Sequence, residues 1–159
     1  MPDPSPDPSR EPPAESGRRN WVDDLTIAAT FLTRVPLSYR IDAGEGRLAR
    51  AAWAIPVVGI GIGLVAGLVY GAATALGLPP MLAAVAAVAM QIWLTGALHE
   101  DALGDVADGF GGGATREEKL RIMRDSHLGT FAVVTLVIAV VARIAALAAR
   151  AEPGAWIVT

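Results

Sequence analysis

The sequence contains no cysteine and only two histidines, His99 and His127. The missing cysteine excludes disulfides and thiolate metal sites, and two histidines are too few for a histidine-based metal centre. Any metal ion bound here would therefore be a hard cation held by oxygen ligands. Charge is also scarce, since Asp, Glu, Lys and Arg make up 18% of the residues and the net charge is -3. This balance argues against nucleic acid as a partner.

Hydrophobic residues make up 53% of the chain, more than is usual for a soluble domain. Three stretches, 53–76, 79–98 and 128–149, are long enough to cross a bilayer as helices, and the first two carry no charge. The third contains Arg143, which would snorkel or pair with another side chain inside a bundle. The predicted fold class is therefore all-α: a polytopic integral membrane helical bundle with bilayer lipid as a partner.

The N-terminal region has a different composition. Residues 1–20 are rich in proline, serine and charge and have no apolar residue that could seed a core, so they predict a disordered tail before a membrane domain at 21–159. Residues 21–37 have an apolar face that is interrupted by charge. We interpret them as an interfacial or partly re-entrant helix, anchored by Trp21 and stopped by Pro36.

Glycines recur at every fourth position of the first span, at Gly59, Gly63, Gly67 and Gly71. Such a stripe lies on one face of a helix and lets a second membrane helix approach closely. The alternative is that the stripe leaves room for a ring or acyl surface of a substrate. The pattern favours helix packing.

Basic residues flank the spans unevenly. They precede the first span and follow the second, whereas the turn at 77–80 has none. The positive-inside rule therefore places the N-terminus and the loop after the second span in the cytoplasm. The expected arrangement is several spans with a site that faces the cytoplasm. The basic residues are Arg18, Arg19, Arg34, Arg40, Arg47 and Arg50 before the first span, and Arg116, Lys119, Arg121 and Arg124 after the second.

An acidic cluster follows the second span. Asp101, Asp105 and Asp108 are spaced so that they share one face of a helix continuing from that span. Neighbouring like charges repel by roughly 0.2–0.5 kcal/mol per pair, the dipole at a helix C-terminus disfavours anions, and Glu100 adds a fourth negative charge. A bound divalent cation would offset this repulsion, so the pattern predicts a metal site on Asp101, Asp105 and Asp108. The alternative is a solvated acidic helix end at the membrane surface.

The residues after the acidic cluster predict a phosphate site. Gly109, Gly111 and Gly112 belong to a glycine-rich run that, as a loop, would let a phosphate or diphosphate approach backbone N–H groups. Thr115 and Glu118 then have the spacing of a capping box, which predicts a short helix through Arg124.

A second polar group lies before the third span. Asp125 could close the site from the other side or simply cap that span, and His127 could meet a phosphate or lie at the interface. Ser126 lies between them. Arg124 belongs to four basic residues that either bind a substrate phosphate or act only as topology signals.

Four ordered blocks of this chain resemble the cobalamin synthase family, the adenosylcobinamide-GDP ribazoletransferases. They are FLTRVP at 31–36, WAIPVVG at 53–59, the stretch from His99 to Gly113, and RIMRDSHLGTF at 121–131. The chain departs from the family pattern at Glu100, usually aliphatic, at Ala102, usually glycine, and at His127, usually arginine. The change at His127 weakens a phosphate contact by charge at that position.

The resemblance implies a membrane transferase of late vitamin B12 (cobalamin) biosynthesis. Such an enzyme joins adenosylcobinamide-GDP to α-ribazole or its 5′-phosphate, releases GMP and uses Mg²⁺. By this likeness Asp101, Asp105 and Asp108 would be the metal carboxylates, and Asp125 would be a further acidic member of the catalytic site. Gly109, Gly111, Gly112, Arg124, Ser126 and His127 are the expected substrate-binding residues.

Two other functions are weaker alternatives. A CDP-alcohol phosphotransferase acting on lipid would show an alanine–arginine pair between its aspartates, and none occurs here. A cation-binding membrane subunit without catalysis would leave the glycine-rich run and the capped basic helix unexplained. The sequence leaves a homo-oligomer open. It stops at Thr159 inside a new apolar run at 155–158, so we expect it to be part of a longer protein with more spans.

Overall fold

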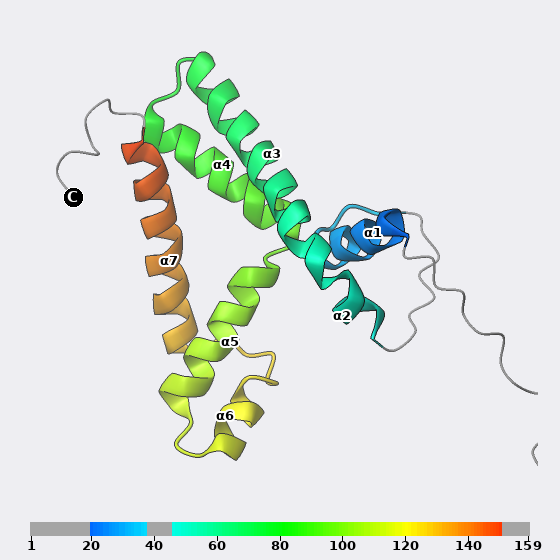
Figure 1. The fold of residues 1–159 in the computed structure, drawn as a ribbon. Coiled ribbons are helices and arrows are strands. Elements are labelled where there is room, and N and C mark those ends of the chain that lie inside the picture. The colour runs from blue at the N-terminus through cyan, green and yellow to red at the C-terminus, as the bar shows by residue number, and fades with distance from the viewer. Residues whose placement is uncertain (1–19, 38–45, 151–159) are drawn as a thin grey trace, which may run out of the picture.

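The computed structural model describes residues 20–37 and 46–150, and all secondary structure in these ranges is helical. Figure 1 shows the helices in order. They are α1 (Trp21–Leu32), α2 (Arg47–Ala51), the 3-10 helix η2 (Ala52–Ala54), α3 (Ile55–Ala75), α4 (Pro80–Thr95), α5 (Leu98–Gly112), α6 (Arg116–Ile122) and α7 (Thr130–Ala149). The all-α prediction is confirmed for this part of the chain. The predicted tail up to residue 19 and the apolar run at 155–158 lie outside the described residues.

Helix α1 is shorter than the sequence suggested. Asn20 caps its start by accepting a hydrogen bond from the Val22 N–H. The helix ends at Leu32, because Thr33 is extended (φ -133°) and its hydroxyl donates to the Ala29 carbonyl at 2.7 Å. The expected stop at Pro36 is therefore wrong by one turn. The Trp53 indole donates to the Asp24 carboxylate at 2.7 Å, which ties η2 to α1.

Two continuous helical stretches are long and apolar enough to cross a membrane, Arg47–Ala75 and Thr130–Ala149. They correspond to the first and third predicted spans and are consistent with a membrane protein. The second predicted span is not one straight helix, because α4 and α5 are bent by 86° at the break between them. Counted as one broken span, this pair would be a third crossing.

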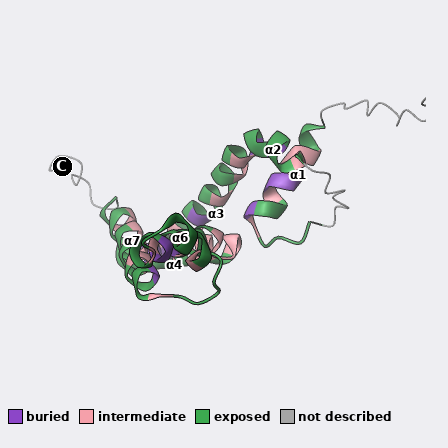
Figure 2. Cartoon of the chain, turned by 90° about the horizontal axis from the view of Figure 1, so that it is seen from below, coloured by how far each residue is buried: buried purple, intermediate pink, exposed green. Residues whose placement is uncertain are grey.

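Helix α7 packs against both arms of the bent pair. Helices α3 and α4 form an antiparallel hairpin, and α7 runs from the far end of α5 back towards the start of α4, so that α4, α5 and α7 enclose a triangle (Figure 1). The buried residues at these contacts are small, among them Ala83, Ala84, Ala87 and Ala132. Small residues let membrane helices approach closely. Most of the other described residues are exposed or half-buried (Figure 2).

The glycine stripe of α3 does not pack against another helix in the described part of the chain. A Cβ atom added at Gly59, Gly63, Gly67 or Gly71 would meet nothing within 4 Å. Helix α3 instead packs on α4, with Ala66 and Ala73 as its buried residues. The predicted packing role is therefore wrong for these helices, and that face of α3 stays open.

Candidate active site

The acidic cluster lies on a helix of its own rather than at the end of the second span. Gly96 (φ +63°) and Ala97 (φ +62°) both adopt the left-handed conformation, which ends α4 and starts α5 in a new direction. The carbonyls that α4 leaves free are bonded locally: Trp93 and Ile92 accept from the N–H groups of Gly96 and Ala97, and Leu94 accepts from the Arg34 N–H at 2.9 Å. The predicted continuous helix is therefore wrong.

This break reverses the electrostatic argument for Asp101. Asp101 lies in the first turn of α5, where the helix dipole stabilises anions. The expected penalty from a helix C-terminus is therefore wrong for this residue. The shared face is confirmed, because α5 is continuous from Leu98 to Gly112 and Asp101, Asp105 and Asp108 are four and three residues apart on it.

The three aspartates differ in environment along this face. Asp101 is exposed, Asp105 is half-buried, and Asp108 is 8% exposed. Both Asp108 carboxylate oxygens accept hydrogen bonds from the first turn of α7, Oδ2 from the Gly129 N–H at 2.6 Å and Oδ1 from the Ala132 N–H at 2.9 Å. Gly129 occupies the N-cap position of α7 and, as glycine, has no side chain with which to cap the helix. Asp108 therefore caps α7 from a different helix.

The glycine-rich run is helical where a loop was expected. Gly109, Gly111 and Gly112 belong to α5, and Gly113 ends it with an extended backbone. A Cβ at Gly109 would lie 3.2 Å from the Lys119 carbonyl, and a Cβ at Gly113 would lie 2.7 Å from the Lys119 N atom. A Cβ at Gly111 would collide with the Phe131 ring. These glycines therefore allow α6 and α7 to pack closely on α5, and the phosphate loop predicted at this position is not formed.

The capping box at the start of α6 is confirmed. The Glu118 N–H donates to the Thr115 hydroxyl, and the Glu118 carboxylate accepts from the backbone N–H groups of Ala114 at 2.9 Å and Thr115 at 3.2 Å. The Ala114 and Thr115 bonds lower the pKa of the Glu118 carboxyl. The box fixes the direction in which α6 leaves α5.

Asp125 and His127 form an exposed ion pair before α7. The Asp125 Oδ1 lies 2.5 Å from His127 Nδ1 and also accepts from the His127 N–H. The side-chain hydrogen bond to His127 is the main cause that lowers the pKa of Asp125, and the same bond raises the pKa of His127. Asp125 therefore bonds to its neighbour, and no bond joins it to the aspartates of α5 within the described chain.

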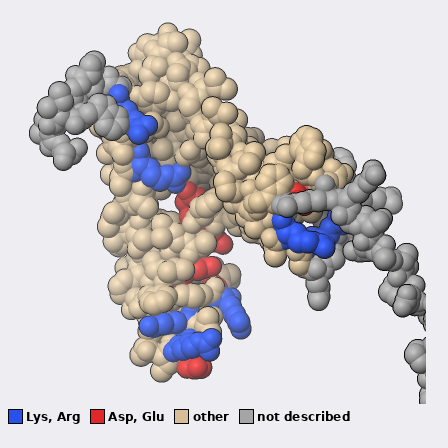
Figure 3. Space-filling model, in the orientation of Figure 1, with Lys and Arg blue, Asp and Glu red and all other residues tan. Residues whose placement is uncertain are grey.

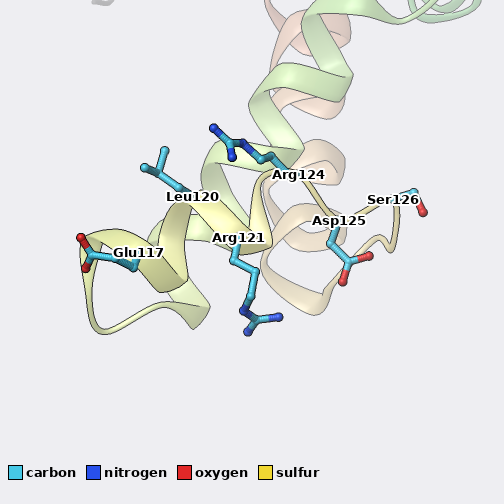
Figure 4. Close-up of a pocket in the computed structure, with 6 residues that line it drawn as sticks. All are labelled: Glu117, Leu120, Arg121, Arg124, Asp125 and Ser126. Atoms are coloured by element: carbon cyan, nitrogen blue, oxygen red, sulfur yellow. The ribbon is translucent and has the colours of Figure 1, made fainter.

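An open pocket of ≈ 720 Å³ lies beside this pair and is lined by Glu117, Leu120, Arg121, Arg124, Asp125 and Ser126. Figure 4 shows Arg121 and Asp125 pointing to the same side of the pocket, whereas Arg124 points the other way. Arg124 and Ser126 were expected to bind substrate, and the structure brings them to one pocket. Arg121 faces this pocket as well, although the sequence marked it only as one of four basic residues.

A polar network between three helices was only partly foreseen. Arg143 of α7 contacts Glu100 of α5 at 2.5 Å and donates to the Gln91 side-chain oxygen of α4 at 2.8 Å. Of the two alternatives for Arg143, snorkelling or pairing with another side chain, the structure shows the pairing. Its partners were missed, although Gln91 is the only amide side chain in the second predicted span.

The chain is similar to known proteins over most of its length. A profile of the family described as Cobalamin-5-phosphate synthase matches residues 24–159. The chain belongs to this family. It is 52% identical over 141 residues to the adenosylcobinamide-GDP ribazoletransferase of Bradyrhizobium diazoefficiens, covering 89% of this chain and 54% of that protein. The proteins of the same name from Sinorhizobium sp and Rhizobium johnstonii are 45% and 41% identical, over 81% and 84% of this chain and 50% and 52% of theirs.

The chain thus spans about half the length of the curated relatives that it matches. No solved structure matches it. In this cobalamin-5-phosphate synthase segment, the profile covers the bend, the acidic face of α5 and the Asp125–His127 pair.

The acidic face of this family member has the donor chemistry of a magnesium site. Carboxylate oxygens are the ligands that Mg²⁺ prefers, with water and substrate phosphates completing the shell. Each Asp108 oxygen has a second lone pair besides the one used by a backbone N–H, and hydrogen-bonded carboxylates make well-oriented ligands. No group of three or more His, Asp or Glu side chains in the described ranges is already gathered around one point. The oxygen donors on this face are therefore of the type that Mg²⁺ uses.

Proposed function

We propose that this chain is part of an adenosylcobinamide-GDP ribazoletransferase. The enzyme would join adenosylcobinamide-GDP to α-ribazole or its 5′-phosphate and release GMP, which is the last stage of cobalamin assembly. The family membership and the names of the relatives support this proposal. The observation that carries it is the face of α5 on which Asp101 and Asp105 precede an Asp108 held by the backbone of α7.

Asp101, Asp105 and Asp108 would hold Mg²⁺, which neutralises charge on the diphosphate and on the departing GMP when it is bound. The cap on α7 orients Asp108, and the exposed Asp101 and half-buried Asp105 remain accessible to substrate. A carboxylate of this face that is not engaged by metal would accept the proton of the attacking ribazole hydroxyl. Because α5 leaves the bend at 86° to α4, this face lies beside the apolar helices rather than within one of them.

The pocket beside α6 would bind a phosphate of the substrate. Arg121 and Arg124 supply positive charge there and Ser126 supplies a hydroxyl, and guanidinium groups suit phosphate oxygens. Asp125 would complete the acidic side of the catalytic site. His127 is tied to Asp125, so its charge is partly offset by the carboxylate. We assign the glycines Gly109, Gly111 and Gly112 to the shape of this region, where they bring α6 against α5.

The protein would be a multi-pass protein of the bacterial inner membrane, with its site towards the cytoplasm. Lys and Arg gather over α6, over the region of α1 and α2, and along the C-terminal half of α7, which carries Arg143 and is followed by Arg150 (Figure 3). The turn between α3 and α4 has no basic residue. This distribution supports a cytoplasmic position of α6 by the positive-inside rule, where GDP-linked substrate is available.

The test is release of GMP from adenosylcobinamide-GDP by purified protein in lipid, measured with and without α-ribazole and across a magnesium titration. We expect release only when α-ribazole and Mg²⁺ are both present. Asp101→Asn and Asp105→Asn keep the side-chain shape and remove one charge, so each should reduce turnover by at least a hundredfold or raise the magnesium requirement. Gly59→Ala, on the open face of α3, is the matched control and should retain turnover. GMP release that ignores magnesium, or wild-type turnover in both aspartate variants, would contradict the proposal.

A further inference from the structure

The bend between α4 and α5 is bridged by one side chain from a third helix. Arg143 of α7 uses one guanidinium nitrogen for Glu100, two residues inside α5, and the other for Gln91, one turn before the end of α4. The two partners lie on opposite sides of the break at Gly96 and Ala97. The network therefore spans the bend from arm to arm.

The Glu100 end of this network is shielded from solvent. The side chain of Glu100 is 14% exposed, and that of Arg143 is 39% exposed. The Glu100 Oε2 atom is buried and has no hydrogen-bond partner in the described ranges. A buried carboxylate with one partnered oxygen depends on that partner, since loss of the cation would leave an unpaired charge in an apolar setting.

The contact pattern requires an arginine rather than any cation. Nη1 and Nη2 point in different directions from one planar group, so Arg143 can satisfy a carboxylate and an amide oxygen together. A lysine ammonium is a single compact centre and would hold one of the two partners well. A charge that only neutralised Glu100 would not need the second contact to α4.

Glu100 is followed directly by Asp101, the first carboxylate of the acidic face. Any change in the angle between α4 and α5 would therefore move Asp101 and Asp105 relative to α4 and to the segment at Arg34, which is bonded to Leu94. We propose that Arg143, with Glu100 and Gln91, forms a brace that fixes the angle of the broken helix and so positions Asp101 and Asp105 for the reaction. This role rests on the proposed function, whereas the brace itself does not.

The angle can be measured directly, because the chain has no native cysteine to interfere with spin labelling. Leu82 on α4 and Val106 on α5 are exposed, at 53% and 48%, and lie on the two arms. We expect a single narrow distance between labels at these positions in lipid. Labels at Leu82 and Leu64, within the α3–α4 hairpin, are the control pair, which the brace does not cross.

The decisive variant is Glu100→Leu/Arg143→Leu, which removes the brace without leaving a buried charge. A brace predicts a broadened Leu82–Val106 distance, an unchanged control distance, and kcat lowered at least tenfold with KM for adenosylcobinamide-GDP changed less than threefold. Arg143→Lys should give a Leu82–Val106 distance distribution of intermediate width. In the reversed pair, Glu100→Arg/Arg143→Glu, the new carboxylate at position 143 can accept from the Gln91 amide once that amide is flipped. This variant should narrow the Leu82–Val106 distance again and recover part of kcat.

Three results would overturn parts of this inference in different ways. A narrow distance and full kcat in the double leucine variant would show that the pair only neutralises charge. A broadened distance with unchanged kcat would remove the positioning role. Absence of GMP release by the wild-type protein, with distances that respond as expected, would refute the proposed function and support the brace.

Discussion

Asp108 shows how one residue of the acidic face can serve structure and chemistry together. Its two oxygens bond to the Gly129 and Ala132 N–H groups, which are among the N–H groups that a helix start leaves without intrahelical partners. Gly129 is needed at this point for space rather than for an unusual backbone angle, because a Cβ there would lie 2.6 Å from Asp108 Oδ1.

We expect Gly129→Ala to displace the Asp108 carboxylate and leave the buried Ala132 N–H and the partly buried Gly129 N–H unpaired. The cost should be about 1–3 kcal/mol in the free energy of unfolding, measured by denaturation in mixed micelles. Asp108→Asn should lose one of the two bonds, because an amide nitrogen cannot accept from a backbone N–H. Its loss of unfolding free energy should lie in the same range. Gly59→Ala, where an added Cβ meets nothing within 4 Å, is the control and should not destabilise. Equal stability of Gly129→Ala and Gly59→Ala would contradict the cap.

The Asp125–His127 pair predicts a pH dependence at the mouth of the pocket. The pKa of His127 is raised above its ordinary value of 6.5 by Asp125, and the pKa of Asp125 is lowered below its ordinary value of 3.8 by His127. The contribution of His127 to folding stability is present below pH 6.5 and is lost as the pH rises through its raised pKa. That of Asp125 is present above pH 3.8 and is lost as the pH falls through its lowered pKa.

An NMR titration of the His127 ring should therefore give a pKa above 6.5 that returns towards that value in Asp125→Asn. A His127 pKa that does not respond to Asp125→Asn would show that the ion pair is not formed in solution.

At the scale of the elements, the bend depends on two residues with positive φ. Gly96 adopts φ +63° and packs against Arg34, so that an added Cβ would lie 2.5 Å from Arg34 Nε. Ala97 adopts φ +62° despite its side chain, which costs about 1–2 kcal/mol for a non-glycine residue. The strain is maintained by the bonds that close the end of α4.

Gly96→Ala should therefore destabilise the protein by more than about 1 kcal/mol, since it adds left-handed strain and a clash. Ala97→Gly should have the opposite sign, because glycine removes the strain already present. The measurement is the midpoint of unfolding for both variants, with Gly96→Ala/Arg34→Ala to separate the clash from the backbone term. If Gly96→Ala and Ala97→Gly change stability equally, the bend does not depend on these angles.

The sequence predicted the elements better than their junctions. Long apolar stretches identified α3 and α7, and the Thr115–Glu118 spacing identified the start of α6, because both signals are local. The break at Gly96 was hidden, since a single glycine in an apolar helix is tolerated and Ala97 gives no turn signal. The helical state of Gly109 to Gly112 was also missed, because it depends on packing against Lys119 and Phe131.

The same limit applies to the candidate site. Spacing alone placed Asp101, Asp105 and Asp108 on one face, and this holds. It could not show that Asp108 bonds to α7, or that Glu100 meets Arg143 and Gln91, because these contacts join positions at least twenty residues apart in the chain. Such pairs are formed by tertiary structure and leave no periodic signal.

For the whole molecule, the distribution of charge predicts an orientation. A cysteine in place of Glu117, exposed on α6, should react in intact cells only with reagents that enter the cytoplasm, because basic residues surround it. A cysteine at Leu78, in the turn between α3 and α4, should react with impermeant reagents from outside. The chain has no native cysteine, so each label reports one position. Outside labelling at position 117 would refute both the topology and the access of GDP-linked substrate.

The hydrogen bond between Asp108 and Gly129 also joins the two ends of the segment that connects α5 to α7. The chain between these two residues includes the last turn of α5, α6 and the pocket, and it returns to Asp108 at a hydrogen bond of 2.6 Å. The entropic cost of closing such a connecting segment depends only weakly on its length, at about 0.6 kcal/mol for each doubling. Its length can therefore change at small entropic cost while α5 and α7 keep their crossing, so an insertion near the pocket would leave the acidic face of α5 in place.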